Sequence, residues 1–246
     1  MNVCAADLHV HTALSPCAEN DMTPPAIVAR ALAEGLGMIA VCDHNSAGNA
    51  AAVQEAAGTR LAVLAGMEIS TAEECHVVAL FPDAEAARAA GAEVGATLGQ
   101  VDDDYEAFFG EQRILDADGS ERARETLALA TATTLDVDAA VRLIHSHGGL
   151  AIAAHVDRRS FGVIGQLGLF PAAAGFDAIE LSRHVAPGSA DAARFAVHGL
   201  PLVHASDAHY QSDIGTARTR VNCARPTFAE LALALAGRRG RSIGDA

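Results

Sequence analysis

The sequence Asp7-Leu8-His9-Val10-His11-Thr12 places two histidines at the end of the first apolar segment of the chain. Residues 4–9 have the length and the pattern of a buried strand, so we expect an extended backbone there. Side chains two positions apart on an extended backbone point to the same side. His9 and His11 can therefore bind one metal ion together, and the segment predicts a metal site at a strand end.

Other apolar segments end in the same way, on residues that can bind a metal. These residues are Asp43 with His44, then Glu68, His155, and Asp207 with His209. In parallel α/β barrels the active site lies at the carboxyl ends of the strands, so we expect these side chains to meet at one mouth. His76 is a further candidate, although it stands at the start of its predicted strand.

Short apolar runs alternate with alanine-rich helical stretches, which is the pattern of a parallel sheet with crossover helices. We expect strands at residues 4–9, 38–42, 61–67, 76–81, 150–154, 176–181 and 201–205, and helices at residues 24–35, 46–57, 84–91, 136–147, 188–198 and 227–238. Seven strands predict an α/β fold with a barrel or near-barrel rather than an open sheet. Residues 1–246 are interpreted as a single domain, because the length is close to the roughly 250 residues of such barrels.

Residues 97–131 interrupt this alternation. They are acidic, with Asp102-Asp103-Asp104, and they contain a hairpin turn at Asp116-Ala117-Asp118-Gly119 between short strands. We interpret the segment as an insertion, which is either a lid over the site or a surface decoration.

The composition argues against several classes of protein. The formal charge is −14 and all 17 basic residues are arginine, which disfavours an extended nucleic-acid-binding surface. Five cysteines without a Cys-x-x-Cys pair argue against a zinc ribbon, a thioredoxin motif or a disulfide framework. No apolar run reaches the roughly 18 residues of a membrane span, and the first residues do not resemble a signal sequence. We therefore expect a cytoplasmic protein with no membrane partner, whose oligomeric state the sequence does not indicate.

The ligand types indicate which ions the site prefers. Imidazole and carboxylate suit zinc, manganese or iron, and Glu68 can bridge two ions through its two oxygens. The sequence supports a first site of His9, His11 and Asp207 with Glu68, a second of Glu68, His76 and His155, and a third from His44 and His209. We expect two or three divalent ions as cofactors. Two ions roughly 3.5–4 Å apart can activate a hydroxide and stabilise the charge on a phosphate during attack.

These motifs resemble those of the polymerase and histidinol phosphatase (PHP) family of metal-dependent phosphoesterases, and the resemblance covers most of the chain. The motifs are Asp7-Leu8-His9-Val10-His11-Thr12, Asp43-His44-Asn45, Gly66-Met67-Glu68, His76-Val77-Val78, Ala154-His155 and Ser206-Asp207-Ala208-His209. The resemblance implies a distorted (β/α)7 barrel with two or three metal ions at its mouth. It also implies a ligand set of His9, His11, Glu68, His76, His155, Asp207, His44 and His209.

One stretch departs from the family pattern. Some family members supply a further histidine shortly after the first motif, where this chain has Ser15-Pro16-Cys17-Ala18-Glu19. Either Cys17 or Glu19 is the candidate for that position. A thiolate favours zinc or iron, whereas a carboxylate favours a harder ion.

The chemistry also needs side chains that bind the phosphate. Arginine must supply them, because the chain has no lysine, and its guanidinium binds a phosphate through two hydrogen bonds. The candidates are Arg158 and Arg183, with Arg159 beside the first. The expected catalytic residues are Glu68, Asp207, His209, Arg158 and Arg183.

Other polar residues are interpreted as supporting or structural. Asp7 and Asp43 are expected to orient neighbouring histidines, and Glu180 either does the same or is an acid at a helix start. The remaining histidines are interpreted as surface or core residues: His145, His147, His184, His198 and His204.

The predicted function is the hydrolysis of a small phosphate ester, a phosphomonoester or a nucleotide, by a metal-activated hydroxide. Three alternatives stay open: an exonuclease on short oligonucleotides, an amidohydrolase-type hydrolase, and a non-catalytic regulatory module with the same fold. The acidic charge favours a small substrate. The lack of lysine disfavours the amidohydrolases that bridge their ions with a carbamylated lysine, and the complete ligand set disfavours a loss of catalysis.

Overall fold

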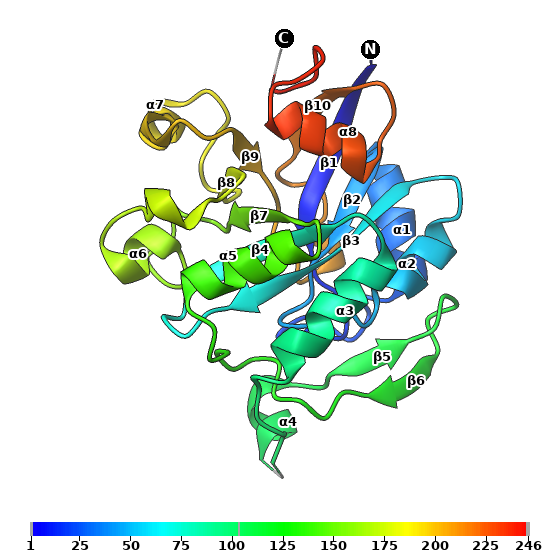
Figure 1. Ribbon diagram of the computed structural model, residues 1–246. Helices are drawn as coiled ribbons and strands as arrows, with labels where there is room; N and C mark the ends of the chain where they lie inside the picture. The colour runs from blue at the N-terminus through cyan, green and yellow to red at the C-terminus, as the bar shows by residue number, and fades with distance from the viewer. Residues whose placement is uncertain (1, 103, 245–246) are drawn as a thin grey trace.

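The computed structural model describes residues 2–102 and 104–244, which are built around one nine-stranded sheet (Figure 1). In sheet order the strands are β11 (Ser242–Ile243), β10 (Thr219–Cys223), β1 (Asn2–Val10), β2 (Met38–Val41), β3 (Ala62–Ser70), β4 (His76–Phe81), β7 (Leu150–Ala153), β8 (Ala178–Leu181) and β9 (Leu202–His204). Strands β1, β2 and β3 are parallel, and so are β7, β8 and β9. Strand β4 is antiparallel to both of its neighbours, and β10 and β11 add antiparallel pairs beside β1.

The sheet curls until the segment after β9 meets β1. Val10 and Ala208 form a parallel bridge, and His11 N donates a hydrogen bond to Ala208 O at 3.0 Å. The Asp7 carboxylate accepts hydrogen bonds from Ser206 N at 3.0 Å and from Ser206 Oγ at 2.6 Å. These contacts give a nearly closed barrel, which confirms the predicted α/β barrel-like fold.

Helices cover the outside of the curved sheet (Figure 1). They are α1 (Pro24–Ala33), α2 (Ala50–Ala57), α3 (Ala84–Gly95), α4 (Tyr105–Phe109), α5 (Val137–Ser146), α6 (Val163–Leu167), α7 (Ala190–Ala193) and α8 (Phe228–Leu235), with short 3-10 turns η1 (Ala172–Ala174), η2 (Ala196–His198) and η3 (Gln211–Asp213). Helices α3 and α5 begin where the carboxylates of Asp83 and Asp136 accept backbone hydrogen bonds. The helix expected at 46–57 begins only at Ala50, because residues 43–49 form a loop at the mouth of the barrel. The helix expected at 188–198 is divided into α7 and η2.

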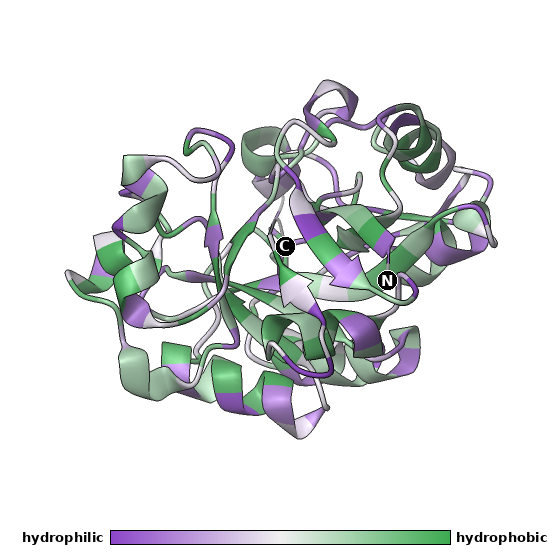
Figure 2. Cartoon of the chain, turned by 90° about the horizontal axis from the view of Figure 1, so that it is seen from above, coloured by the Kyte–Doolittle hydropathy of each residue, from purple (hydrophilic) through white to green (hydrophobic). Residues whose placement is uncertain are grey.

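The core consists of small aliphatic side chains on both faces of the sheet. One cluster lies between the sheet and the surrounding helices. A second includes Leu8, Val78 and Ile152 and continues to Leu231 of α8. Figure 2 shows hydrophobic strands in the middle of the molecule and alternating hydrophobic and hydrophilic residues on the helices around them. Packing on both faces of the sheet fixes the positions of the strand ends, and therefore the positions of the residues that follow them.

The segment of residues 97–131 lies beside the mouth of the barrel. It contains α4 and the predicted hairpin, whose strands are β5 (Arg113–Leu115) and β6 (Glu121–Arg124). Arg113 N donates to Ala13 O at 2.8 Å, and the Asn45 side chain donates to the carbonyls of Leu129 and Thr131 at 2.9 and 3.0 Å. The segment is thus hydrogen-bonded to the two loops that follow β1 and β2. Among the described residues, no helix is long and apolar enough to cross a membrane.

Candidate metal centre

The ends of the strands bring the predicted ligands to one edge of the barrel. Strand β1 carries His9 and ends at Val10, His11 follows directly after it, and β3 carries Glu68 near its end. Strand β4 begins at His76, and because β4 is antiparallel to β3, this first residue pairs with Ser70 at the end of β3. His76, although it stands at a strand start, therefore lies at the same edge of the sheet as Glu68.

The Glu68 carboxylate is buried at the centre of this group. Five histidine nitrogens surround its two oxygens: His76 Nδ1 at 2.8 Å, His155 Nε2 at 3.0 Å, His44 Nδ1 at 3.0 Å, His9 Nε2 at 3.4 Å and His11 Nε2 at 3.6 Å. Because imidazoles surround both of its oxygens, the Glu68 carboxylate can take part in two sets of metal ligands, one at each oxygen.

Asp207 joins the group from the other side of the mouth. His11 Nε2 lies 3.0 Å from Asp207 Oδ1 and 3.1 Å from His9 Nε2. Three sets of converging ligand atoms result: His9, His11, Glu68 and Asp207; His44, Glu68 and His76; and His11, His44 and His209. The first set matches the first predicted site, the second contains His44 where the prediction had His155, and the third adds His11 to the predicted pair.

The donor set fits divalent cations. Glu68 Oε2 and His44 Nδ1 lie 3.0 Å apart, and each is buried without a hydrogen-bond partner among the described residues. Buried polar atoms without partners are costly and rare in proteins. A cation between them would satisfy both atoms, and the nitrogen and oxygen ligands suit zinc, manganese or iron.

The histidine rings are held by a second layer of polar residues. Glu180 contacts His9 Nδ1 through both oxygens, at 3.1 and 3.0 Å. Ser15 Oγ lies 2.9 Å from His11 Nδ1 and donates to Asp43 Oδ1 at 2.7 Å. Asp43 thus supports His11 through Ser15.

Asp7 supports a different part of the site. Its carboxylate binds the backbone and hydroxyl of Ser206 and also accepts from Gly215 N at 2.8 Å. These contacts fix the segment that carries Asp207. Asp207 itself has φ +51°, and His155 has φ +26°, values that non-glycine residues seldom adopt.

The charges of the site favour metal binding. Burial raises the pKa of Glu68, but the nearby His76 and His9 outweigh this and hold it well below its ordinary value. Burial likewise raises the pKa of Asp207, yet His9 and His11 hold it well below the usual range. Both groups are therefore charged carboxylates. Burial and the neighbouring His209 lower the pKa of His11, which favours the neutral imidazole that binds metals.

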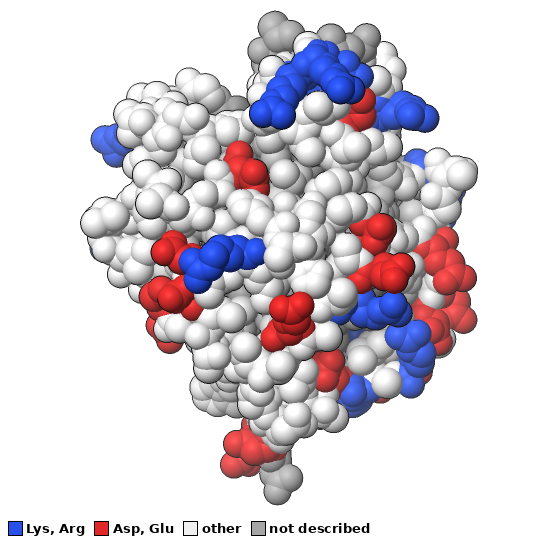
Figure 3. Space-filling view, in the orientation of Figure 1, with Lys and Arg blue, Asp and Glu red and all other residues white. Residues whose placement is uncertain are grey.

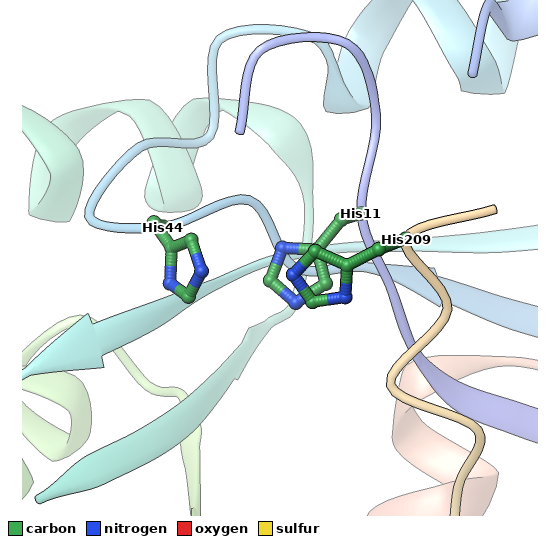
Figure 4. Close-up of side chains that lie close together, drawn as sticks. All are labelled: His11, His44 and His209. Carbon is green, nitrogen blue, oxygen red and sulfur yellow. The ribbon is translucent and has the colours of Figure 1, made fainter. Parts of the chain in front are cut away.

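Cys17 is outside the three sets of ligand atoms, but its thiol interacts with two histidines of the third set. Figure 4 shows the rings of His11 and His209 against each other with His44 facing them, and the ring centroids of His11 lie 4.1 and 4.7 Å from those of His209 and His44. The Cys17 thiol forms hydrogen bonds with His209 and His44. Burial raises the pKa of this thiol, but the two hydrogen bonds prevail and lower it to about 6. Glu19 meets the group through its backbone, since Glu19 N donates to His209 O at 3.0 Å.

The arginines differ in their relation to the cluster. Arg158 Nη1 donates to Asp207 Oδ2 at 2.6 Å. Arg183 Nη1 instead pairs with Asp213 Oδ2 at 2.8 Å. Arg159 is exposed on the same loop as Arg158. Arg158 is thus the arginine in direct contact with a candidate metal ligand.

The other histidines lie away from the cluster. His145 and His147 form surface pairs with Asp177 and Glu93, at 2.9 Å in both cases. The remaining three are His184, which is exposed, His198, which stacks on Phe170, and His204, which is buried near the end of β9.

Sequence reasoning did not find Ser15. Its role depends on the turn from Thr12 to Ser15, in which Ser15 N donates to Thr12 O at 3.0 Å and the hydroxyl comes back to His11 Nδ1. A hydroxyl residue four positions after the second histidine of the first motif was the available signal.

Comparisons with known proteins agree with this geometry. The family model described as PHP domain matches residues 7–169, and the model described as PHP-associated matches residues 191–241. A search of curated protein sequences found no match.

Several solved structures share the fold. The lesion-specific endonuclease Q of Pyrococcus furiosus superposes with a TM-score of 0.76 at 19% identity, over 98% of this chain and 58% of that one. This chain therefore spans little more than half the length of that endonuclease. A protein of Bifidobacterium adolescentis, assigned as a metal-dependent phosphoesterase, has a TM-score of 0.58 at 22% identity, over 84% and 88% of the two chains. An amidohydrolase of Chromobacterium violaceum with bound sulfate has a TM-score of 0.60 at 25% identity, over 92% and 95%.

Proposed function

The chain belongs to the PHP domain family, and from that premise we propose that it is a metal-dependent phosphoesterase that hydrolyses a small phosphate ester, a phosphomonoester or a nucleotide. The observation that supports this most strongly is the buried Glu68 carboxylate with five histidine nitrogens within 3.6 Å. Such a ligand set has no structural need in a folded core, because burying so many polar groups without a cation is costly.

The residues of the site fall into metal ligands and a phosphate-binding arginine. Glu68 lies between two sets of ligands, and Asp207 with His9 and His11 completes one of them. Divalent cations bound there would lower the pKa of a water molecule and offset the negative charge of the phosphate. Arg158, already against Asp207, is placed to bind an ester oxygen. His11, His44 and His209 would hold a third cation, and the thiol of Cys17 beside His44 and His209 is the candidate for a further ligand.

The charge distribution supports a small substrate. The net charge is −14, and Figure 3 shows acidic and basic side chains interspersed over much of the displayed face. The largest basic group on that face lies by α8 and the C-terminal segment, at the end where β1 begins and not where it ends (Figures 1 and 3). A long nucleic acid would need an extended basic surface around the mouth, whereas Arg158 and Arg159 provide only a local one.

A nuclease is the second candidate. The fold shared with endonuclease Q over 98% of this chain favours it, and one solved complex of that enzyme holds a 27-mer duplex with an abasic lesion. A short nucleic acid needs only a local binding site, so the acidic surface does not count against it. The two candidates differ in the size of the substrate and share the same metal centre.

An amidohydrolase is the least supported of the candidate functions. The absence of lysine removes the carbamylated residue that many such enzymes use, and Glu68 occupies the bridging place.

The test is a screen for hydrolysis by the protein, from which metals are first removed with a chelator and to which manganese, zinc or iron is then added separately. Substrates should include phosphomonoesters, cyclic phosphates, a dinucleotide, the abasic duplex and an N-acyl amino acid. Glu68→Ala should lose metal content and turnover together, whereas Glu93→Ala, which removes a surface carboxylate, should retain both. Turnover by Glu68→Ala at the wild-type level would overturn the proposal, and metal bound without any turnover would favour a non-catalytic module.

A further inference from the structure

Aromatic side chains are scarce in this chain, yet two of them stand exposed on the loops of the metal centre. Aromatic residues make up 4% of the sequence. Phe161 is 46% exposed on the loop after His155, and Tyr210 is 50% exposed directly after His209. An exposed aromatic ring beside a binding site offers a flat face on which another ring can stack.

The Phe161 ring is fixed against a candidate ligand. It stacks on the imidazole of His76, with ring centroids 4.6 Å apart and planes inclined by 19°. His76 N donates a hydrogen bond to Phe161 O at 2.8 Å, so ring and backbone are both held. One side of the ring is covered by His76, and the ring remains half exposed to the solvent at the mouth.

The backbone of Phe161 has an unfavourable conformation. Its φ is +63°, in the left-handed region that a bulky residue seldom occupies. Two glycines permit this path, because a Cβ at Gly162 would lie 2.5 Å from Arg158 O and one at Gly165 would lie 2.3 Å from Arg159 O. The loop is therefore tightly wound in a conformation that exposes the Phe161 ring, and strain of this kind is concentrated at functional sites.

The same loop carries positive charge. Arg158 contacts Asp207, as described above, and Arg159 has no carboxylate partner among the residues that the structure describes. Guanidinium groups bind phosphate, and a flat ring binds another flat ring. The loop thus offers both kinds of contact within a few residues of His155.

We propose that Phe161 is a substrate-positioning residue on which the nucleobase of a nucleotide substrate stacks, while the phosphate lies at the metal centre with Arg158 and Arg159. This inference rests on the proposed phosphoesterase function and narrows its substrate class from any small ester to one that carries a nucleobase. Stacking does not depend on the identity of the base, so all four bases should be accepted with similar affinity.

Adenosine 5′-monophosphate and ribose 5-phosphate test this, since the second carries a hydroxyl group at C1 where the first carries the base. The wild type should show a KM for adenosine 5′-monophosphate that is about 5- to 150-fold lower than for ribose 5-phosphate. Phe161→Ala should lose this preference, so that the KM for adenosine 5′-monophosphate becomes similar to that for ribose 5-phosphate, and Phe161→Tyr should keep it. Phe108→Ala, which removes an exposed phenylalanine of α4, is the matched control.

Two results would overturn the proposal. A wild type that treats both esters alike has no nucleobase contact. A Phe161→Ala variant that loses metal content, with KM rising equally for both esters, would show that the ring only supports His76. A trinucleotide assayed in parallel distinguishes a free nucleotide from a strand end as the source of the base.

Calorimetric titration of the metal-loaded protein with the same two ligands separates this inference from the proposed function. If no ester is hydrolysed with any metal, the proposed function fails. A Phe161-dependent preference for adenosine 5′-monophosphate in the titration would still support the stacking site, and equal affinities would overturn it.

Discussion

Glu180 contacts the Nδ1 atom of His9 with both carboxylate oxygens, at 3.1 and 3.0 Å. This contact leaves Nε2 of His9 directed at Glu68 and Asp207, where a metal would bind. Carboxylates in this position fix the tautomer and the orientation of a metal-binding histidine.

Glu180→Gln should therefore weaken metal binding by about 10- to 100-fold, because an amide holds the imidazole less firmly than a carboxylate. Competition with a chelator of known affinity measures the effect. Glu93→Gln, at the exposed pair with His147, should leave the affinity unchanged. An unaltered affinity in Glu180→Gln would mean that the strand alone orients His9.

Ser15 links Asp43 to His11, and its removal affects both. In Ser15→Ala the buried Asp43 loses one of its donors, which should lower the free energy of unfolding by about 1–3 kcal/mol. The freed His11 ring should also bind metal about tenfold more weakly. Urea unfolding of the metal-free protein and chelator competition give the two values. Ser146→Ala, at the exposed end of α5, should stay within about 0.5 kcal/mol of the wild type.

Cys17 should be the most reactive cysteine of the metal-free protein. Its pKa is lowered to about 6 by the hydrogen bonds with His209 and His44, whereas burial raises the pKa of Cys4 and of Cys75 to about 11. The thiolate is the nucleophile, so alkylation by iodoacetamide should rise with pH and reach half its maximum near pH 6.

Peptide mass spectrometry follows that alkylation site by site. Added zinc should slow the reaction if Cys17 is a ligand, and Cys17→Ser should remove the fast phase. A midpoint near the ordinary value of 9.0 would contradict the contacts with His209 and His44.

The sequence predicted the strands that carry ligands because their apolar runs are buried and end abruptly in polar residues. It missed β10 and β11, whose stability comes from backbone pairing with β1 and with each other more than from an apolar pattern. Strand β10 reads Thr219-Arg220-Val221-Asn222-Cys223, in which polar residues alternate with apolar ones only weakly.

The candidate site likewise contains residues that the sequence pattern could predict and residues that it could not. His9 and Glu68 lie on strands and His11 directly follows β1, so their convergence follows from the topology. The places of Ser15 and Phe161 depend on loop geometry, which the sequence pattern does not determine: Ser15 needs the turn after Thr12, and Phe161 needs a positive φ.

Arg158 and Arg183 looked equivalent in the sequence, and the structure separates them. Arg158 contacts the candidate ligand Asp207, whereas Arg183 pairs with Asp213 outside the cluster. If Arg158 binds the phosphate, Arg158→Ala should lower kcat/KM by about 100-fold or more, as the loss of a transition-state donor does. Arg158→Lys should recover only part of this, because an ammonium cannot make the paired hydrogen bonds of a guanidinium. Arg183→Ala should have a much smaller effect, and Arg194→Ala, at an exposed helix pair, should have none. Steady-state kinetics on the best ester of the screen compares the variants, with metal content measured in each. A larger loss in Arg183→Ala than in Arg158→Ala would require Arg183 to leave Asp213 and swing to the substrate.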